Sequence, residues 1–337
     1  MPKHSFDIIP FQAFDGFACN LWRLKHNNST HRGPVMLVHG AGVRANIFNP
    51  PHEVNLLDML ADAGYDVFLE NWRASTELPA NKWDLDLAAK NDHPAAIQKI
   101  CEVTGADECK AIIHCQGSTS FTISAVEGLV PQVKTIVTNA VSLHPVVPFW
   151  SHVKLDVMLQ WIKLVTDYLN PHWGVDAPDL QSKFFKALVL GTHFEKDTTV
   201  GKFVSFTYGA GFPALWELNN LTEETKDWIR NEFGPVPITF FNHIKKGVHY
   251  GSLVSVDGKK RYADTKPATD ARFVFFTGKL NKCFKSESQE NSYHYFNKLR
   301  PNYHKLHVYD TYSHLDIFFG KNAHKDVFPV MIAELNA

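Results

Sequence analysis

The most informative stretch of this chain is Lys110-Ala-Ile-Ile-His-Cys-Gln-Gly-Ser-Thr119. Its apolar beginning predicts a buried strand, and the residues that follow predict the start of a helix. Cys115 stands at the junction, where a tight strand-to-helix turn exposes a single side chain. The nucleophile-bearing form of this turn is written G-x-S-x-G. Here it reads Ile113-His-Cys-Gln-Gly117, so a cysteine replaces the serine and the first glycine is missing.

A second segment, Pro34-Val-Met-Leu-Val-His-Gly-Ala-Gly42, is an apolar run that ends in glycines. Glycines after a central strand let the backbone turn sharply and expose N–H groups. For a nucleophilic cysteine, this loop supplies one oxyanion-hole donor, from Ala41 or Gly42, and Gln116 supplies the other. The alternative is an ordinary glycine-rich turn, beside a cysteine that is only a small buried hydrophobic residue.

A third segment lies further on, Tyr312-Ser-His-Leu-Asp-Ile-Phe-Phe-Gly-Lys-Asn322. His314 follows a strand-like run over 305–309 and precedes the last predicted helix. A catalytic base on the last strand-to-helix loop gives the chain order nucleophile, acid, histidine. One of the 18 histidines easily falls there by chance. Three segments in the right order and spacing are much harder to obtain by chance.

Several residues flank the expected site. His39 and Gly40 begin the glycine loop, and His114 precedes the cysteine. Buried histidines usually bond to nearby backbone, so we expect His39 to brace the loop. Arg73, after Trp72, is expected to pair with a local carboxylate. No metal-ligand spacing stands out, and no metal is predicted.

With these segments in place, the chain resembles the α/β-hydrolase superfamily. More narrowly, it resembles the hydrolase domain found beside or fused to bacterial cholesterol-oxidase-like (GMC) oxidoreductases, a relative of the acid lipases. The likeness covers nearly the whole chain and is carried by Glu70-Asn-Trp-Arg-Ala-Ser75, His114-Cys-Gln-Gly-Ser118, Ser142-Leu-His-Pro145, Thr207-Tyr-Gly209, Asn281-Lys-Cys-Phe284, His314-Leu-Asp316, Gly320-Lys-Asn-Ala323 and Asp326-Val-Phe-Pro329. The elbow cysteine also resembles that of polyhydroxyalkanoate synthases, which use Cys-His-Asp for acyl transfer.

The resemblance implies an α/β-hydrolase fold, with a mostly parallel central sheet flanked by helices and an inserted helical cap. It also implies a Cys115–His314 couple, in which a thiolate of depressed pKa at a helix N-terminus attacks a carbonyl. Acid lipases place an aspartate where this chain has Asn281, which we expect to orient His314 through its amide oxygen. Glu287 is the alternative orienting group, and Asp316 is expected to fix the local loop.

Three functions remain open. The first, which we favour, is an acyl hydrolase, an esterase or thioesterase that acts on a hydrophobic ester through a thioester acyl-enzyme. The second is an acyltransferase with the same Cys-His couple, and the third is a non-catalytic partner of an oxidoreductase. The missing elbow glycine and Asn281 favour the third, whereas the glycine loop and His314 oppose it. None of the three requires a cofactor.

The composition is that of a globular enzyme of 337 residues, enough for one large α/β domain with a cap or for two small domains. A net charge of −1 gives no strong attraction to nucleic acid or an anionic membrane. No apolar run reaches the ~18 residues of a membrane span, and the N-terminus lacks the apolar core of a signal peptide. The five cysteines, without a C-x-x-C pair, favour a cytoplasmic location. Composition leaves the oligomeric state open.

Alternating strand and helix patterns predict a mainly parallel sheet covered on both faces. The hydrolase core is predicted at 1–143 and 269–337, with the cap at 144–268. Strands are predicted at 35–39, 66–70, 111–114, 133–139, 273–277 and 306–309, after a hairpin over 5–25, and helices at 53–63, 93–104, 117–129 and 324–335. In the cap, apolar residues from Leu155 to Val165 recur with helical spacing. The cap aromatics either contact an acyl or sterol group or only hold the cap together.

Overall fold

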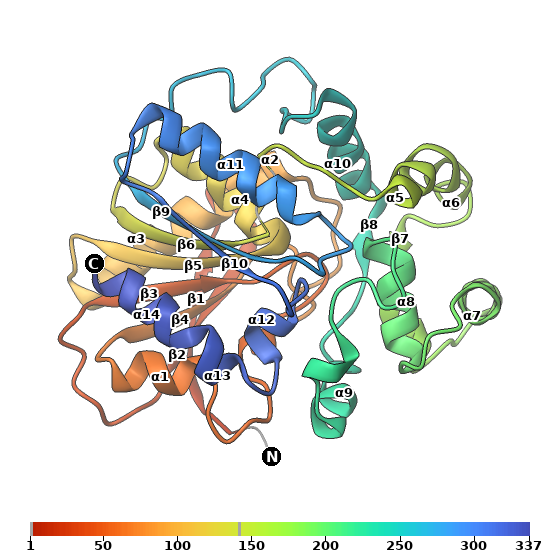
Figure 1. The fold of residues 1–337 in the computed structure, drawn as a ribbon, viewed down its shortest axis with the longest axis horizontal. Helices are drawn as coiled ribbons and strands as arrows, with labels where there is room; N and C mark the ends of the chain where they lie inside the picture. The colour runs from red at the N-terminus through yellow and green to blue at the C-terminus, as the bar shows by residue number, and fades with distance from the viewer. Residues whose placement is uncertain (1–2, 141–142) are drawn as a thin grey trace.

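The computed structural model describes residues 3–140 and 143–337, so Ser142 of one quoted motif lies outside the described residues. The strands of the main sheet are β1 (Phe6–Gln12), β2 (Ala18–Leu24), β3 (Pro34–Val38), β4 (Asp66–Asn71), β5 (Cys109–His114), β6 (Val133–Asn139), β9 (Arg272–Gly278) and β10 (Lys305–Tyr309). They form one eight-stranded sheet in the order β1-β2-β4-β3-β5-β6-β9-β10 (Figure 1). The β1–β2 hairpin and the β2–β4 pair are antiparallel, and all other neighbours are parallel. The mainly parallel sheet is confirmed.

Helices cover both faces of this sheet. Those outside the segment between β6 and β9 are α1 (Leu56–Asp62), α2 (Leu85–Leu87), α3 (His93–Thr104), α4 (Cys115–Val126), α11 (Ser286–Leu299), α12 (Asp316–Phe319), α13 (Ala323–Asp326) and α14 (Phe328–Asn336). In Figure 1, α4 and α11 lie on one side of the strands, and α1 and α14 lie on the other. β3 is buried along its whole length, as expected of a parallel strand covered on both faces.

The ends of the early helices follow local sequence signals. Asn55 caps α1 by accepting hydrogen bonds from the backbone N–H groups of Leu57 and Asp58. The chain leaves α1 through Gly64, whose φ of +89° lies in the left-handed region that glycine tolerates. Gly105 closes α3 in the same way, with φ +71°. The predicted helix ends near residues 64 and 104 are therefore confirmed.

The last helix differs from the prediction of one continuous helix over 324–335. The structure has two helices, α13 and α14, with a break at Val327. Pro329 stands in the first turn of α14. Proline has no N–H to donate, and its ring clashes with the carbonyl four residues earlier, so a helix tends to end before it. The interruption therefore follows from a residue that the apolar pattern alone does not weigh.

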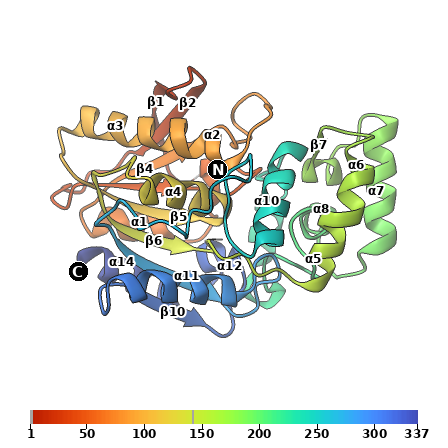
Figure 2. The same cartoon turned by 90° about the horizontal axis from the view of Figure 1, so that it is seen from above.

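The segment between β6 and β9 folds beside the sheet rather than within it (Figures 1 and 2). It contains α5 (Phe149–Val153), a π-helical turn over Lys154–Met158, α6 (Leu159–Ile162), α7 (Leu180–Thr192), α8 (Thr199–Tyr208), α9 (Glu223–Ile229), α10 (Ile238–Tyr250) and the short pair β7 (Tyr168–Leu169) and β8 (Val236–Pro237). The predicted helical pattern up to Val165 extends too far, because the helix ends at Ile162 and Val165 is exposed.

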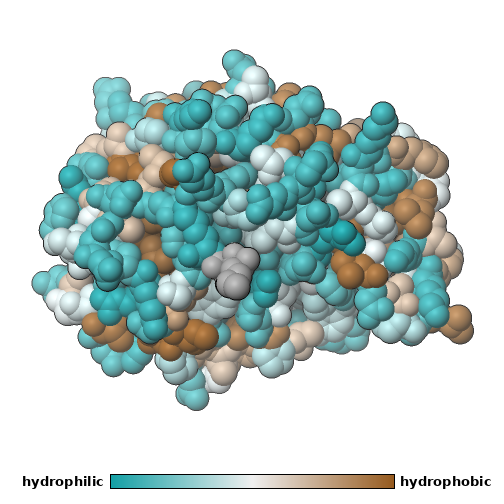
Figure 3. All heavy atoms as spheres, turned by 90° about the horizontal axis from the view of Figure 1, so that it is seen from below, coloured by the Kyte–Doolittle hydropathy of each residue, from teal (hydrophilic) through white to brown (hydrophobic). Residues whose placement is uncertain are grey.

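Exposed apolar side chains gather on this segment. The face drawn in Figure 3 is largely hydrophilic, with separate smaller hydrophobic patches. Between β6 and β9, by contrast, large exposed apolar residues include Phe149, Trp150, Trp161, Leu164, Leu180, Phe184, Phe194 and Phe212. Within residues 3–140 and 143–337, no helix combines the length and apolar character needed to cross a membrane.

Candidate active site

The turn between β5 and α4 has the strained geometry of a nucleophile elbow. Cys115 has φ +55°, a left-handed conformation that residues with a side chain rarely adopt. A Cβ atom on Gly117 would lie 2.2 Å from the carbonyl oxygen of His39, so glycine is required where α4 approaches the loop after β3. The position of the missing first glycine is taken by Ile113, which is fully buried in β5. The elbow therefore forms without that glycine.

Backbone N–H groups converge on the sulfur of Cys115. Those of Gln116 and Ala41 are hydrogen-bonded toward the thiol. The N–H of Gly42 instead donates to the carbonyl of Ala74 at 3.3 Å. One donor was expected from the glycine loop, from either Ala41 or Gly42. The structure places Ala41 at the thiol, while Gly42, with φ +64°, lies in the turn.

Cys115 is 7% exposed, and burial raises the pKa of its thiol to about 12. The hydrogen bonds from Gln116 and Ala41 lower this pKa, but burial has the larger effect. The expected thiolate of depressed pKa at a helix N-terminus is therefore wrong for the resting site. The cysteine rests as a neutral thiol.

His314 lies beside Cys115, as the chain order predicted. It precedes α12, is fully buried, and burial lowers its pKa to about 3, so the imidazole is neutral. One ring nitrogen of His114, the sulfur of Cys115 and one ring nitrogen of His314 all lie within 4.8 Å of one another. In the described part of the chain, the Nε2 atom of His314 has no hydrogen-bond partner. A neutral imidazole and a neutral thiol therefore share one buried space.

Asn281 contacts His314, but with the end of its amide opposite to the one expected. Its Nδ2 lies 3.1 Å from Nδ1 of His314. Its Oδ1 accepts the backbone N–H of Cys283 at 2.9 Å. The expectation of orientation through the amide oxygen is therefore wrong, because the amide nitrogen of Asn281 faces the ring. Glu287 is exposed in the first turn of α11, and no described hydrogen bond joins it to His314.

Asp316 fixes the loop that carries His314, as expected. Its carboxylate accepts the backbone N–H of Ser313 at 2.8 Å and the side-chain N–H of Asn220 at 2.6 Å. The group is fully buried, and burial raises its pKa to about 6. Asn220 belongs to the segment between β6 and β9, so this carboxyl also ties that segment to the loop.

The flanking histidines have different partners. Nδ1 of His39 bonds to the carbonyl of Gly40 at 2.7 Å, and the indole N–H of Trp72 donates to the carbonyl of His39 at 3.0 Å. His39 thus braces the glycine loop as predicted. His114 bonds instead to a side chain, with Nδ1 2.8 Å from Oδ1 of Asn139, and its ring centre lies 4.9 Å from that of His314. Nothing in the sequence pattern separates these two cases.

A buried hydrogen-bonded series of three side chains lies beneath the elbow, and no sequence motif predicts it. Nδ1 of His93 lies 2.8 Å from a carboxyl oxygen of Glu70, and its Nε2 lies 2.7 Å from Oγ of Ser120. All three side chains are fully buried. Ser120 is also 3.0 Å from the carbonyl of Gln116, so the series anchors α4 to β4 and α3.

Arg73 belongs to a neighbouring buried network. It bonds to Asp92 at 2.6 Å and to Asp15 at 2.9 Å. The predicted pairing of Arg73 with a local carboxylate is therefore confirmed, with two partners rather than one.

The cavity at Cys115 is small and apolar. It measures 60 Å³ and is lined mainly by hydrophobic groups, among them Val147, Leu155, Phe240, Phe241, Ile244 and Phe284. Lys154 also reaches it, and donates to the carbonyls of Ser205, Phe206 and Gly209 at the end of α8. Burial lowers the pKa of Lys154 to about 8. The cavity favours an apolar group next to the sulfur.

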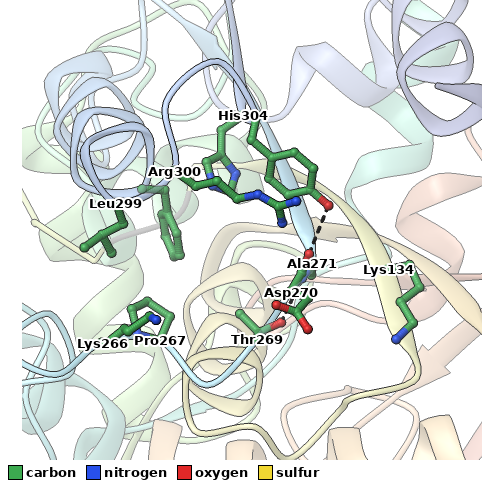
Figure 4. Close-up of a pocket in the computed structure, with 11 residues that line it drawn as sticks. Lys134, Lys266, Pro267, Thr269, Asp270, Ala271, Leu299, Arg300 and His304 are labelled. Carbon is green, nitrogen blue, oxygen red and sulfur yellow. Dashed lines mark hydrogen bonds between the residues drawn. The ribbon is translucent and has the colours of Figure 1, made fainter.

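A larger cavity, of 450 Å³, lies elsewhere (Figure 4). Its lining includes Lys134 at the start of β6, Ala271 just before β9 and His304 just before β10. These positions are the amino ends of strands parallel to β5, whereas Cys115 follows the carboxyl end of β5. In open α/β sheets, ligands bind beyond the carboxyl ends. The larger cavity is therefore not the candidate site.

The chain matches known lipases and esterases over part of its length. No family model matches it. Gastric triacylglycerol lipase of Rattus norvegicus is 37% identical over 136 residues, and the match covers 35% of this chain and 33% of the lipase. Sterol esterase 2 of Saccharomyces cerevisiae is 26% identical over 171 residues, and the match covers 42% of this chain and 32% of the esterase. The chain spans about a third of the length of these relatives.

Solved structures match over nearly the whole chain. A soluble variant of monoglyceride lipase from Saccharomyces cerevisiae, in complex with a substrate analogue, has a TM-score of 0.62 at 14% identity and covers 98% of this chain and 94% of its own. A thermophilic esterase from Thermogutta terrifontis has a TM-score of 0.60 at 12% identity and covers 98% of each chain. At such low identity the likeness concerns the fold. The chain therefore has the α/β-hydrolase fold, the fold of these lipases and esterases.

Proposed function

We propose that this protein hydrolyses ester bonds of hydrophobic, lipid-like substrates, with Cys115 as the nucleophile. The observation that carries the proposal is the convergence at one sulfur of a strained elbow, two backbone N–H donors and neighbouring imidazoles. An acyl-transfer site needs these three parts: a nucleophile, a base and donors for the developing oxyanion.

The mechanism begins from neutral groups. Because the thiol pKa is about 12, the thiol loses its proton to a neighbouring imidazole as the sulfur attacks the ester carbonyl. The carbonyl electron pair moves to oxygen, where the N–H groups of Ala41 and Gln116 stabilise the negative charge. Collapse expels the alcohol, which takes the proton, and leaves a thioester on Cys115. Water then attacks the thioester, and the acid is released.

The substrate class follows from the cavity and from the relatives. The cavity beside Cys115 is lined mostly by apolar side chains, and exposed aromatic residues lie on the segment between β6 and β9. Two curated relatives are named for triacylglycerols and sterol esters. We therefore expect an ester or thioester with an apolar acyl group. All five cysteines are free, which fits the proposed cytoplasmic location.

The test is a series of p-nitrophenyl esters of increasing chain length, together with one acyl-thioester. Release of nitrophenol or thiol by wild type, and its loss in Cys115→Ala, is the expected result. Cys101→Ala is the matched control, because it removes a partly exposed thiol on α3. If an added alcohol is converted into a new ester, the proposed activity is acyl transfer instead of hydrolysis. No product from any substrate would overturn the proposal in favour of a non-catalytic partner.

A further inference from the structure

The glycine loop after β3 carries one of the two N–H donors at Cys115, and the segment between β6 and β9 contacts this loop. The hydroxyl of Tyr208, at the end of α8, donates to the carbonyl of Ala41 at 3.0 Å. The backbone N–H of Gly234 donates to the carbonyl of Gly42 at 2.9 Å. The segment that lies beside the sheet is therefore bonded to the residue that supplies the donor.

Ala41 lies between two peptide groups, and both are held by hydrogen bonds. The N–H that points at the thiol belongs to the Gly40–Ala41 peptide, whose carbonyl is bonded to Nδ1 of His39 at 2.7 Å. The next peptide, Ala41–Gly42, is held at both ends, because its carbonyl accepts from Tyr208 and its N–H donates to a carbonyl beyond β4. Each peptide group is planar, so holding both fixes the direction of the Ala41 N–H.

The bond from Tyr208 restrains a part of the backbone that has much conformational freedom. Gly40 and Gly42 flank Ala41, and glycine loses more freedom on folding than any other residue. Gly42 has φ +64°, and a Cβ atom there would lie 2.3 Å from the hydroxyl oxygen of Tyr208. The tyrosine therefore fills the space that a side chain at position 42 would need.

The last turn of α8 is itself held, so Tyr208 has a fixed place. Nζ of Lys154 donates to three carbonyls at the end of α8, and the thiol of Cys283 donates to the carbonyl of Tyr208 at 3.1 Å. Carbonyls at the end of a helix lack helical partners, and these donors supply them. Burial raises the pKa of the Tyr208 phenol well above its usual value, so the hydroxyl keeps its hydrogen and remains a donor.

The same turn is also bonded to the histidine side of the site. Besides donating its thiol to Tyr208, Cys283 donates its backbone N–H to Oδ1 of Asn281 at 2.9 Å. Nδ2 of Asn281 lies 3.1 Å from Nδ1 of His314. Tyr208 is thus bonded through its side chain to the glycine loop, and through its carbonyl to the turn that holds His314.

We infer that Tyr208 is a positioning residue for the proposed reaction, because its hydroxyl holds Ala41 with the N–H directed at the developing oxyanion. The inference rests on the proposed function and adds to it a residue from the segment between β6 and β9. An oxyanion donor is effective when it already points to the place where charge develops. Without the hydroxyl, the buried carbonyl of Ala41 loses its partner, and the loop is free to turn its N–H away.

The kinetic test uses Tyr208→Phe, which removes the hydroxyl and keeps the ring. Loss of an oxyanion donor costs about 10²–10³-fold in kcat, and a donor that is only loosened should cost less, about 10- to 100-fold. We expect that fall in kcat for an apolar p-nitrophenyl ester, with KM nearly unchanged and the protein folded by circular dichroism.

Tyr65→Phe is the matched control for the loss of a tyrosine hydroxyl. Tyr65 is fully buried, donates to Oδ1 of Asn336 at 2.7 Å and precedes the amino end of β4, away from Cys115. Its kcat should equal that of wild type, even if its thermal stability falls as much as that of Tyr208→Phe. A loss of kcat in Tyr208→Phe no larger than in Tyr65→Phe would overturn the inference.

Two reagents then separate the oxyanion from the sulfur. With an alkyl trifluoromethyl ketone, the Cys115 sulfur bonds to the carbonyl carbon, the C=O electron pair moves to oxygen, and the thiol proton passes to a neighbouring imidazole. The product is a hemithioketal whose oxyanion needs the N–H donors. Iodoacetamide alkylates the same sulfur with loss of iodide and forms no oxyanion.

For Tyr208→Phe, the affinity for the ketone should fall by the same factor as kcat/KM, because the ketone adduct resembles the transition state. The rate of Cys115 alkylation, followed by peptide mapping, should equal that of wild type. Equal losses with both reagents would overturn the inference, since they would place the effect at the sulfur. A wild type that neither hydrolyses esters nor binds the ketone would instead contradict the proposed function, and the inference with it.

Discussion

The site at Cys115 and the buried hydrogen-bonded series that ends at Ser120 contain similar functional groups, but we expect only the first to be catalytic. Glu70, His93 and Ser120 have the residue types and contacts of a complete carboxyl–imidazole–hydroxyl series, at 2.8 Å and 2.7 Å. Among the described residues, no carboxylate bonds to Cys115 or to the imidazole of His314. Yet Ser120 lies inside α4, fully buried and bonded to backbone carbonyls, while Cys115 stands at a strained apex beside a cavity.

The difference shows that access and oxyanion donors define this site, rather than the presence of three residue types. Two backbone N–H groups point at Cys115, whereas Ser120 meets the carbonyls of Gln116 and Gly117. A carbonyl next to a nucleophile repels a developing oxyanion, and N–H groups stabilise it. The hydrogen-bonded series of Glu70, His93 and Ser120 is therefore expected to stabilise the elbow.

The largest expected effect is on activity, for a substitution of Cys115 itself. We expect Cys115→Ser to lower kcat/KM by at least about 10³-fold, close to the loss of a nucleophile. A hydroxyl is much harder to deprotonate than a thiol, and the imidazoles at this site lack the carboxylate that Ser120 has through His93. The measurement is ester hydrolysis under subsaturating substrate, with thermal unfolding as a check on the fold. Retention of most activity would show that the site does not depend on sulfur.

The opposite result is expected at His93. His93→Ala removes the shared partner of Glu70 and Ser120 and leaves the carboxyl of Glu70 unpaired. We expect the free energy of unfolding to fall by about 3–5 kcal/mol, measured by urea denaturation. Activity per folded molecule should remain, because neither group reaches the cavity at Cys115. A loss of acylation in fully folded protein would mean that the buried series takes part in catalysis.

The neutral state of Cys115 gives a pH dependence. A raised pKa keeps the thiol protonated to higher pH, so the thiolate fraction rises about tenfold per pH unit below a pKa of about 12. Alkylation of Cys115 by iodoacetamide, followed by peptide mapping, should therefore quicken about 100-fold between pH 7 and pH 9. A rate already constant across that range would reveal the depressed pKa of a thiolate–imidazolium pair.

The smallest effect is expected for Ser120→Ala. The substitution removes a buried hydroxyl that contacts His93 and the carbonyls of Gln116 and Gly117, and we expect a loss of about 1–3 kcal/mol of unfolding free energy. kcat should not change, since the hydroxyl has no route to substrate. Denaturation and hydrolysis assays on the same preparation separate the two quantities. A kcat loss as large as that of Cys115→Ser would reverse the roles of the two regions.

Much of the fold could be predicted from the chain. The run Val133–Asn139 is a strand with the predicted bounds, and the hairpin around Gly16 forms as expected. These elements depend on local pattern and turn residues. The split of the last helix at Val327 shows the limit, because the apolar pattern continues across Val327, whereas Pro329 has no N–H to continue the helical hydrogen bonds from α13.

The sequence predicts which residues form the candidate site, but it does not predict their protonation states. Cys115, Ala41, Gln116 and His314 meet because parallel strands end at one edge of the sheet. The pKa of the thiol depends on burial, which no local pattern records. The hydrogen bond of His114 depends on Asn139, a neighbour on the adjacent strand whose own amide donates to the carbonyl of Phe276.

The most direct test of the central claim is the mass of the acyl-enzyme. Wild type is mixed briefly with a p-nitrophenyl ester and quenched in acid. Intact-protein mass spectrometry then gives the mass of the adduct, and digestion with peptide mapping locates it. We predict one acyl group on Cys115, which decays with time and is absent from Cys115→Ala. An adduct on Ser120, or nitrophenol release from wild type and Cys115→Ala alike, would contradict the account.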